Sequence, residues 1–310
     1  MICDIQVVNN MVENHSIKEY IQRYEAQFDA RIQGIAEEIA RGVGQRQIVL
    51  VAGPSSCGKT TFTLKLNHAL QQLGIASQTV SLDDFYLDRQ RAPRKEDGSF
   101  DYETVESLDL QEIERCFAQL LEQGSADMPL FSFKLGRALE ERKHVELPSN
   151  GVVLVEGMHA LSSRLRQYFP DEHTLRIYIS LRSNLFAGEN VLLDKRYLRI
   201  LRRMVRDYKF RASGPEKTLC MWMDVMDGDM LYVEPFEHTA DIRIDSFFPY
   251  EAGVLKPMAE QLLAMVPHES RYYHLSQGIL QKLERVDVIE ETLLPGTSLL
   301  REFVGDSIYY

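Results

Sequence analysis

The segment Gly53-Pro-Ser-Ser-Cys-Gly-Lys-Thr60 limits what this chain can fold into more than any other feature, because it matches the full pattern G-x-x-x-x-G-K-[ST]. An apolar run typical of a buried strand, residues 47–52, comes directly before it, and a predicted helix, residues 59–73, follows. A strand that turns into a helix through such a loop presents backbone amides and the helix N-terminus to an anion. The sequence therefore predicts a phosphate-binding loop.

The loop residues have distinct expected roles. Lys59 is expected to reach the β- and γ-phosphates of a nucleotide, and the Thr60 hydroxyl to bind Mg²⁺. Cys57 is interpreted as a small residue that fits the loop rather than as a redox group. The predicted nucleotide contacts are Gly53, Ser55, Ser56, Cys57, Gly58, Lys59, Thr60 and Thr61.

Predicted strands and helices alternate along the chain. Such alternation predicts an α/β fold with a parallel sheet covered by helices on both faces. The predicted strands are residues 47–52, 78–82, 151–155, 174–180 and 240–245. The predicted helices are residues 16–42, 59–73, 109–123 and 189–210, and the tail from residue 250 is expected to be mostly helical.

The apolar stripe of the 16–42 helix has two interpretations. It could form a dimer seam, but packing on its own domain is the more common outcome. Ser16 and Glu19 predict a capping box at the start of this helix. A homo-oligomer is the expected assembly, with this helix or the helical tail as its interface.

The net charge and the cysteine content restrict which partners, metal sites and disulfides we expect. With 46 acidic and 35 basic residues, the net charge is −11, which disfavours nucleic acid and anionic lipid as partners. The four cysteines lie far apart, which supports neither a disulfide framework nor a zinc site. We find no signal peptide and no apolar stretch long enough for a membrane span, so a cytoplasmic protein is expected.

One basic cluster stands out against this acidic background. Residues 195–211 carry eight basic side chains. Arg199, either Arg202 or Arg203, and Arg206 recur at three- and four-residue steps and so share one helical face. Guanidinium groups beside a phosphate-binding loop would stabilise charge on a transferred phosphoryl group. The alternatives are a solvated basic face or a surface for RNA or membrane, which the surrounding acidity weakens.

Three acidic residues end predicted strands. Glu156 follows the apolar run 151–155 and is the candidate for holding the metal or its water, although it could be a solvated strand-end charge. Asp83 and Asp84 follow the 78–82 strand, where a carboxylate could orient an acceptor hydroxyl and take its proton. One of the two aspartates could instead be a cap or turn residue, and spacing alone does not decide which.

Together these motifs resemble the uridine kinase and phosphoribulokinase family of P-loop kinases, in particular the bacterial branch of uridine kinase-like nucleoside kinases. The resemblance covers residues 45–310 and includes S-L-D-D-F-Y (81–86), V-E-G-M-H-A-L (155–161), R-I-L-R-R-M-V-R-D (199–207) and S-L-L-R-E-F-V-G (298–305). It implies an ATP- and Mg²⁺-dependent kinase that phosphorylates the 5′-hydroxyl of a nucleoside. It also implies an N-terminal helical extension (1–44), a P-loop kinase domain (45–250) with an arginine-rich helical lid, and a C-terminal helical addition (251–310) packed on it.

The resemblance assigns roles to individual residues. Asp83 matches the family's catalytic aspartate, and Arg203, Arg206 and Arg211 match lid arginines near the phosphates. The implied acceptor site comprises Tyr86, Glu106, Phe131, Phe133 and Arg199.

One departure from the family pattern bears on the acceptor. Gly136 stands where uridine–cytidine kinases carry a base-reading histidine, so selectivity for a pyrimidine edge is in doubt. A phosphoribulokinase-like sugar or sugar-phosphate kinase is therefore an alternative, with Arg137 available to a substrate phosphate. A nucleotide-dependent regulatory or RNA-associated protein is a further alternative.

Overall fold

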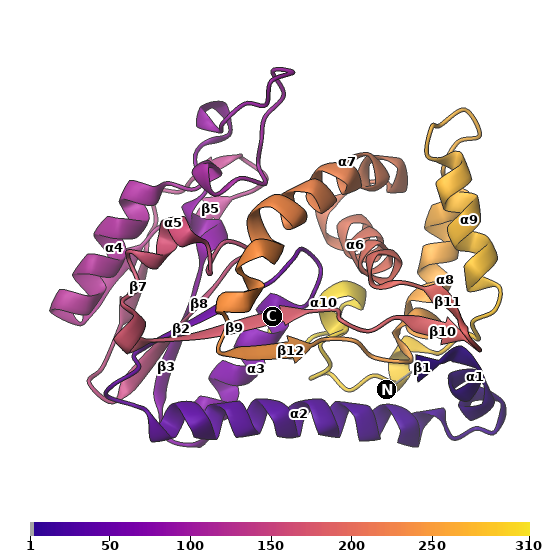
Figure 1. The fold of residues 1–310 in the computed structure, drawn as a ribbon, viewed down its shortest axis with the longest axis horizontal. Coiled ribbons are helices and arrows are strands. Elements are labelled where there is room, and N and C mark those ends of the chain that lie inside the picture. The colour runs from indigo at the N-terminus through magenta and orange to yellow at the C-terminus, as the bar shows by residue number, and fades with distance from the viewer. Residues whose placement is uncertain (1–2) are drawn as a thin grey trace.

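A five-stranded parallel sheet forms the centre of the computed structural model, which describes residues 3–310 (Figure 1). Its strand order is β12-β9-β2-β8-β3. The strands are β2 (Ile48–Ala52), β3 (Ala76–Ser81), β8 (Gly151–Glu156), β9 (Thr174–Ser180) and β12 (Ile242–Asp245). Because all five run in the same direction, their carboxyl ends meet at one edge of the sheet.

Both faces of the sheet are covered, as the alternation of side chains along β2 shows. Val49 and Val51 belong to one hydrophobic cluster, and Ile48 and Leu50 belong to another. Helices α2 (Ile17–Arg41), α3 (Lys59–Gln72), α6 (Lys195–Arg211) and α8 (Glu251–Ala264) contribute to the first cluster. Helix α4 (Leu110–Gln123) contributes to the second. The predicted fold class is confirmed.

Helix α2 buries its apolar stripe within its own chain and runs beneath α3. The interpretation that it packs on its own domain is therefore right. Its predicted capping box is wrong, because the Ser16 hydroxyl makes no bond to the helix amides and donates instead to Met11. Met11 lies in helix α1 (Ile5–Glu13), which the sequence analysis missed.

The basic helix begins later than predicted. Residues 190–193 form strand β11 (Asn190–Leu193), which pairs with β10 (Leu185–Ala187), and β10 in turn pairs with β1 (Cys3–Asp4). Asp194 then caps α6 by accepting bonds from the amides of Arg196 and Tyr197. The Asp194 cap is the physical reason that α6 starts at residue 195.

Smaller elements complete the fold. They are β4 (Ser125–Met128) paired with β7 (Lys143–Glu146), β5 (Phe131–Ser132) paired with β6 (Arg137–Ala138), and helices α5 (Ser163–Arg166), α7 (Pro215–Gly228), α9 (Tyr273–Leu283) and α10 (Arg301–Val304). No helix within residues 3–310 is long and apolar enough to span a bilayer.

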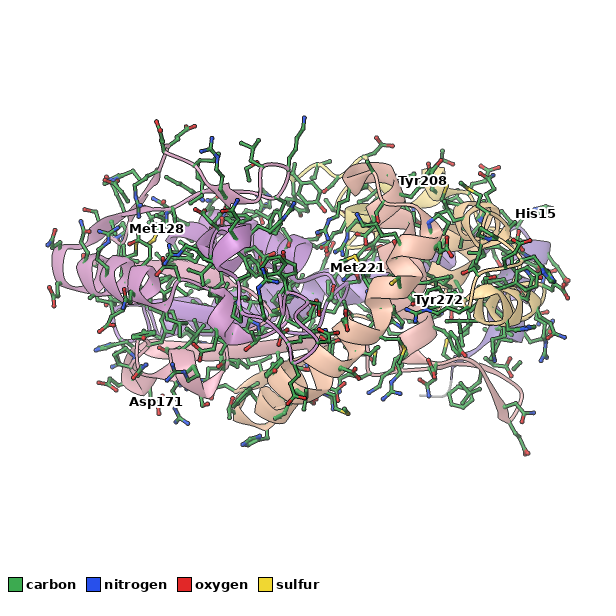
Figure 2. All side chains as sticks on the ribbon, turned by 90° about the horizontal axis from the view of Figure 1, so that it is seen from above. His15, Met128, Asp171, Tyr208, Met221 and Tyr272 are labelled. Carbon is green, nitrogen blue, oxygen red and sulfur yellow. The ribbon has the colours of Figure 1, made fainter. Side chains whose placement is uncertain are left out.

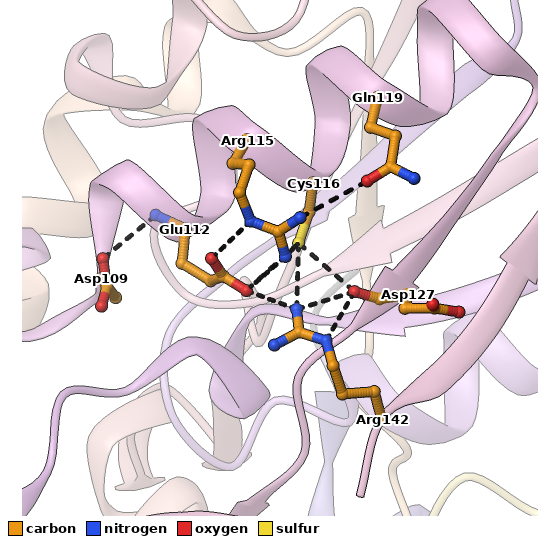
Figure 3. A network of polar contacts seen from close by, with 7 residues as sticks. All are labelled: Asp109, Glu112, Arg115, Cys116, Gln119, Asp127 and Arg142. Atoms are coloured by element: carbon orange, nitrogen blue, oxygen red, sulfur yellow. Dashed lines mark hydrogen bonds and ion pairs between the residues drawn. The ribbon is translucent and has the colours of Figure 1, made fainter. Parts of the chain in front are cut away.

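A polar network fixes α4 to the β4–β7 hairpin (Figure 3). Arg142 donates to the Asp127 carbonyl at 2.7 Å and pairs with Glu112, which also holds Arg115. The two guanidinium groups keep the pKa of Glu112 low, at about 2. Cys116 is buried beside them, and burial raises the pKa of its thiol to about 11, so this cysteine is an unreactive packing residue.

An ion pair between Arg202 and Glu251 joins α6 to the start of α8 and has no exposed side-chain surface. Arg202 also donates to the Ser246 carbonyl at 2.7 Å, and Glu251 accepts from the Phe248 amide. Burial raises the pKa of Glu251, and the neighbouring guanidinium opposes that shift. Removing one partner would leave the other charge buried and unpaired.

We predict that Glu251→Ala lowers the free energy of unfolding by about 3–5 kcal/mol, because it leaves Arg202 buried without its counter-charge. Urea denaturation followed by circular dichroism measures this loss. Arg166→Ala is the control, since Arg166 pairs at the surface with Asp171 (labelled in Figure 2) and its loss should leave the unfolding midpoint unchanged. Equal effects of the two substitutions would contradict the prediction.

Candidate active site

A cavity of about 160 Å³ opens at the carboxyl edge of β2, β3 and β8. It combines the phosphate-binding loop with four carboxylates, three arginines and two aromatic rings. Its lining residues are Ser55, Ser56, Gly58, Lys59, Thr60, Asp83, Tyr86, Glu103, Phe133, Glu156, Met158, Arg203, Arg206, Arg211 and Glu302.

The backbone of the loop requires glycine at two positions. A Cβ atom on Gly53 would lie 1.9 Å from the Ile179 carbonyl oxygen, so the loop can leave β2 along this path only without a side chain. Gly58 has a φ of +90°, in the left-handed region, and a Cβ atom there would meet Leu299 at 2.4 Å. Lys59 donates to the Pro54 carbonyl at 3.1 Å, across the mouth of the loop.

Two arginines of α6 hold the loop from the other side. Arg199 donates to the Ser55 carbonyl at 2.9 Å, and Arg203 donates to the Ser55 hydroxyl at 2.8 Å. Arg199 is buried, pairs with Asp229 and lies over the Trp222 ring at 5.3 Å. Arg199 therefore positions the loop and does not line the cavity. The resemblance had implied instead that Arg199 contacts the acceptor.

Three arginines of the lid gather around one aspartate. Asp207 lies 3.3 Å from Arg203, 3.5 Å from Arg206 and 3.4 Å from Arg211. Burial lowers the pKa of Arg203, and burial together with Arg206 lowers the pKa of Arg211 to about 10. Glu302 lies 3.7 Å from Arg206 as well, so two carboxylates face three guanidinium groups, and this face of the cavity favours an anionic ligand.

Thr60 and Glu156, the two residues predicted to hold a divalent cation, lie next to each other. The Thr60 hydroxyl lies 3.5 Å from Glu156 Oε1, which also accepts a 2.9 Å bond from Ser81. Burial, reinforced by Asp83, raises the pKa of Glu156 to about 7. These oxygen donors suit Mg²⁺, and a cation would relieve the repulsion between the carboxylates, so the residues fit the implied metal.

The structure separates the two neighbouring aspartates. Asp83 lines the cavity, and its backbone amide donates to the Ser81 hydroxyl at 3.3 Å. Asp84 points to the β5–β6 hairpin, where it accepts a 3.1 Å bond from the Phe131 amide. Asp83 is thus placed to meet a ligand, and Asp84 to hold the hairpin.

An aromatic cluster borders the cavity opposite the lid. The rings of Tyr86, Phe131 and Phe133 lie 5.2–6.0 Å apart, and the Phe133 side chain is 58% exposed. Glu103 reaches the same cavity, and burial raises the pKa of its carboxyl group to about 7. An apolar wall with a buried carboxylate nearby suits a ring-bearing ligand that also carries hydroxyl groups.

Several predicted site residues lie elsewhere. Glu106 pairs with Arg164 at 3.0 Å on the surface, Arg137 is exposed in β6, and Phe131 supports Phe133 without lining the cavity. The sequence analysis missed Glu103, Met158 and Glu302 among the lining residues. Met158 lies within the V-E-G-M stretch and Glu302 within the S-L-L-R-E-F-V-G stretch, so both could have been found there, whereas Glu103 carries no local signal.

A parallel sheet with this loop, an acidic strand end and an arginine-rich helix facing them defines a P-loop nucleotide-binding protein. The chain belongs to the Phosphoribulokinase / Uridine kinase family, whose sequence profile matches residues 48–249.

Individual relatives are similar at low identity. The chain is 27% identical to a uridine kinase of Bacillus pumilus over 64% of its own length and 85% of that protein. It is also 27% identical to uridine-cytidine kinase C of Dictyostelium discoideum over 68% of its length, which spans 41% of that protein. A crystal structure described as that of a fructose transport system kinase from Silicibacter sp. TM1040 superposes with a TM-score of 0.50 at 18% identity, covering 68% of this chain and 98% of that one. This likeness shows the fold.

We predict that Mg²⁺·ATP binds more tightly as the pH rises from 6 to 8. Glu156 keeps a proton below its pKa of about 7, and that proton must leave before a cation binds, so affinity should fall by up to about tenfold for each pH unit below 7. Calorimetric titration at several pH values measures this. Glu156→Gln should bind more weakly and lose this part of the pH dependence, while the ionisation of ATP itself affects both proteins equally. Parallel pH profiles for the two proteins would show that Glu156 does not hold the metal.

Proposed function

We propose that this chain is a kinase that transfers the γ-phosphoryl group of ATP, with Mg²⁺, to the 5′-hydroxyl of a nucleoside, with a uridine- or cytidine-like acceptor favoured. The observation that carries the proposal is the position of Asp83, which shares one cavity with Lys59 and the lid arginines. A protein that only bound nucleotide would have no need of a carboxylate at that place. The family membership and the similarity to a uridine kinase support the same conclusion.

In this proposal, different residues of the cavity have different roles in phosphoryl transfer. Loop amides and Lys59 hold the phosphates, and Arg203, Arg206 and Arg211 stabilise charge on the transferred group. Thr60 and Glu156 would hold Mg²⁺, which neutralises phosphate charge when bound. The acceptor oxygen bonds to the γ-phosphorus, the bond to the β,γ-bridging oxygen breaks, and ADP leaves.

Asp83 takes the proton of the acceptor hydroxyl in this scheme. Glu156 and Glu103 share the cavity with it. Burial raises the pKa of both glutamates to about 7. In this scheme Glu156 would hold Mg²⁺ and Glu103 would bind the acceptor, which leaves Asp83 to take the proton. Closing the lid over the cavity would exclude water and so limit hydrolysis of ATP.

Glu103 is our candidate for binding the acceptor's other hydroxyl groups. It enters the cavity beside the Phe133 and Tyr86 rings, which can pack against a base or sugar. A Cβ atom at Gly228 would lie 2.5 Å from the Glu103 Cβ, so α7 packs directly behind it. This packing of α7 therefore fixes the position of the Glu103 side chain in the cavity.

A sugar-phosphate acceptor is the second candidate, and one observation favours it. Gly136 has a φ of +66°, and a Cβ atom there would meet the Arg89 guanidinium at 3.0 Å. Arg89 also donates to the Phe133 carbonyl at 3.2 Å, so a cation lies at the hairpin that borders the acceptor side. An acceptor with its own phosphate would use that charge.

Mass spectrometry of the reaction products tests the proposal. We expect Mg²⁺·ATP and a panel of nucleosides, ribose and sugar phosphates to yield a nucleoside monophosphate, and Asp83→Asn to lower the turnover number at least about a hundredfold. A phosphorylated sugar product without any nucleoside present would favour the second candidate. Slow ATP hydrolysis alone, equal in wild type and Asp83→Asn, would contradict a kinase and favour a regulatory protein.

Glu103 and Glu106 provide a matched pair for the acceptor site. We predict that Glu103→Gln raises the KM for the acceptor by about tenfold or more, because a buried carboxylate that accepts hydroxyl hydrogen bonds is lost. Glu106→Gln removes only a surface pair with Arg164 and should leave the KM unchanged. A larger increase in KM for Glu106→Gln than for Glu103→Gln would instead support Glu106 as the acceptor-binding residue, as the resemblance implied.

A further inference from the structure

The segment 299–310 reaches the phosphate-binding loop although it lies outside the family match. Glu302 Oε2 accepts bonds from the Thr61 amide at 3.2 Å and the Thr61 hydroxyl at 3.1 Å. Its other oxygen lies 3.7 Å from Arg206 of the lid. A carboxylate thus occupies a position formed by a helix-start amide, a hydroxyl and a guanidinium, all of which are donors suited to a phosphate.

A second cavity, of about 430 Å³, adjoins the first at this point. The two cavities share Thr60, Arg206, Arg211 and Glu302, so Glu302 stands at the boundary between them. The outer cavity is also lined by Phe210, which is 57% exposed. Its ring packs over Gly305, where an added Cβ atom would lie 3.3 Å from the ring. Its volume falls within the range of small-ligand sites.

The segment is firmly attached around Glu302. Leu299, Leu300 and Phe303 are fully buried, and Lys209 of α6 donates to the Val304 carbonyl at 2.6 Å. Lys65 of α3 donates to the Thr297 carbonyl at 2.7 Å. A ligand can therefore displace the Glu302 side chain by rotation while the backbone of the segment stays in place.

We propose that the outer cavity binds the nucleoside portion of the donor nucleotide, with the base against Phe210, and that the phosphate chain displaces Glu302 from Thr61. The proposal rests on the proposed function, because it assumes that the loop binds a nucleoside triphosphate. A phosphate chain that connects the two cavities must pass the position that Glu302 occupies. Two anions cannot share the Thr61 amide, so the carboxylate and the phosphate compete for it.

Inorganic tripolyphosphate separates the two parts of the proposal, since it has the phosphate chain without a nucleoside. Calorimetric titration with Mg²⁺·ATP and Mg²⁺·tripolyphosphate is performed on the full chain and on two variants. Phe210→Ala should weaken ATP about tenfold or more through lost stacking and leave tripolyphosphate unchanged. Glu302→Gln should tighten both ligands by about tenfold, because it removes a competing charge.

Matched controls come from α6 and from the residues that precede the segment 299–310. Tyr208 lies on the exposed surface of α6 (Figure 2), and Glu291 pairs with Lys209 at 3.4 Å, so neither lines the two cavities. Tyr208→Ala and Glu291→Gln should bind both ligands as the wild type does. Circular dichroism confirms that all four variants are folded.

Each result has a separate meaning. Equal loss of ATP and tripolyphosphate affinity in Phe210→Ala, or no loss at all, overturns the nucleoside site. Unchanged or weaker binding by Glu302→Gln overturns the competition. If the wild type binds neither ligand, the proposed function fails together with this inference, whereas failure of the variants alone leaves the proposed function intact.

Discussion

The close approach of Gly53 to the Ile179 carbonyl is the contact on which the site depends. It lets the chain leave β2 beside β9 and turn at once into α3, so the loop amides come to lie over the carboxyl edge of the sheet. Arg199 and Arg203 then clamp the loop through Ser55, which brings the whole basic helix into contact with the phosphate position. Any side chain at residue 53 would move the loop away from both the sheet and the lid.

The cavity contains both carboxylates and guanidinium groups whose charged forms are disfavoured by burial. Burial raises the pKa of Glu156 and Glu103 and lowers the pKa of Arg203 and Arg211, so carboxylates and guanidinium groups alike are held in a state that a ligand would relieve. A cation bound to the carboxylates and a phosphate chain bound to the arginines would satisfy both sets at once. This is the electrostatic environment expected for transfer of a highly charged group.

The sequence predicted those parts of the fold and site that depend on local pattern. Strands, the main helices and the loop follow from apolar runs and spacing, and Glu156 follows from its place at the end of β8. Glu103 and Glu106 show where such reasoning stops, because they lie three residues apart in one polar stretch and spacing gives no reason to prefer either. Packing of Gly228 of α7, more than a hundred residues away, is what places Glu103 in the cavity.

The same limit explains why the sequence analysis did not assign Glu302 to the cavity. Leu299 fills the space that a side chain at Gly58 would need, so the phosphate-binding loop and the segment 299–310 fit one another at atomic contact. The family profile ends at residue 249, yet this later segment supplies a lining residue to both cavities. If the outer cavity binds the donor nucleotide as we propose, a chain that keeps the family's loop and lid can change its donor site through a segment outside the family match. Such a change would leave Asp83 and Glu156 in place, because Asp83 lies in the turn directly after β3 and Glu156 ends β8.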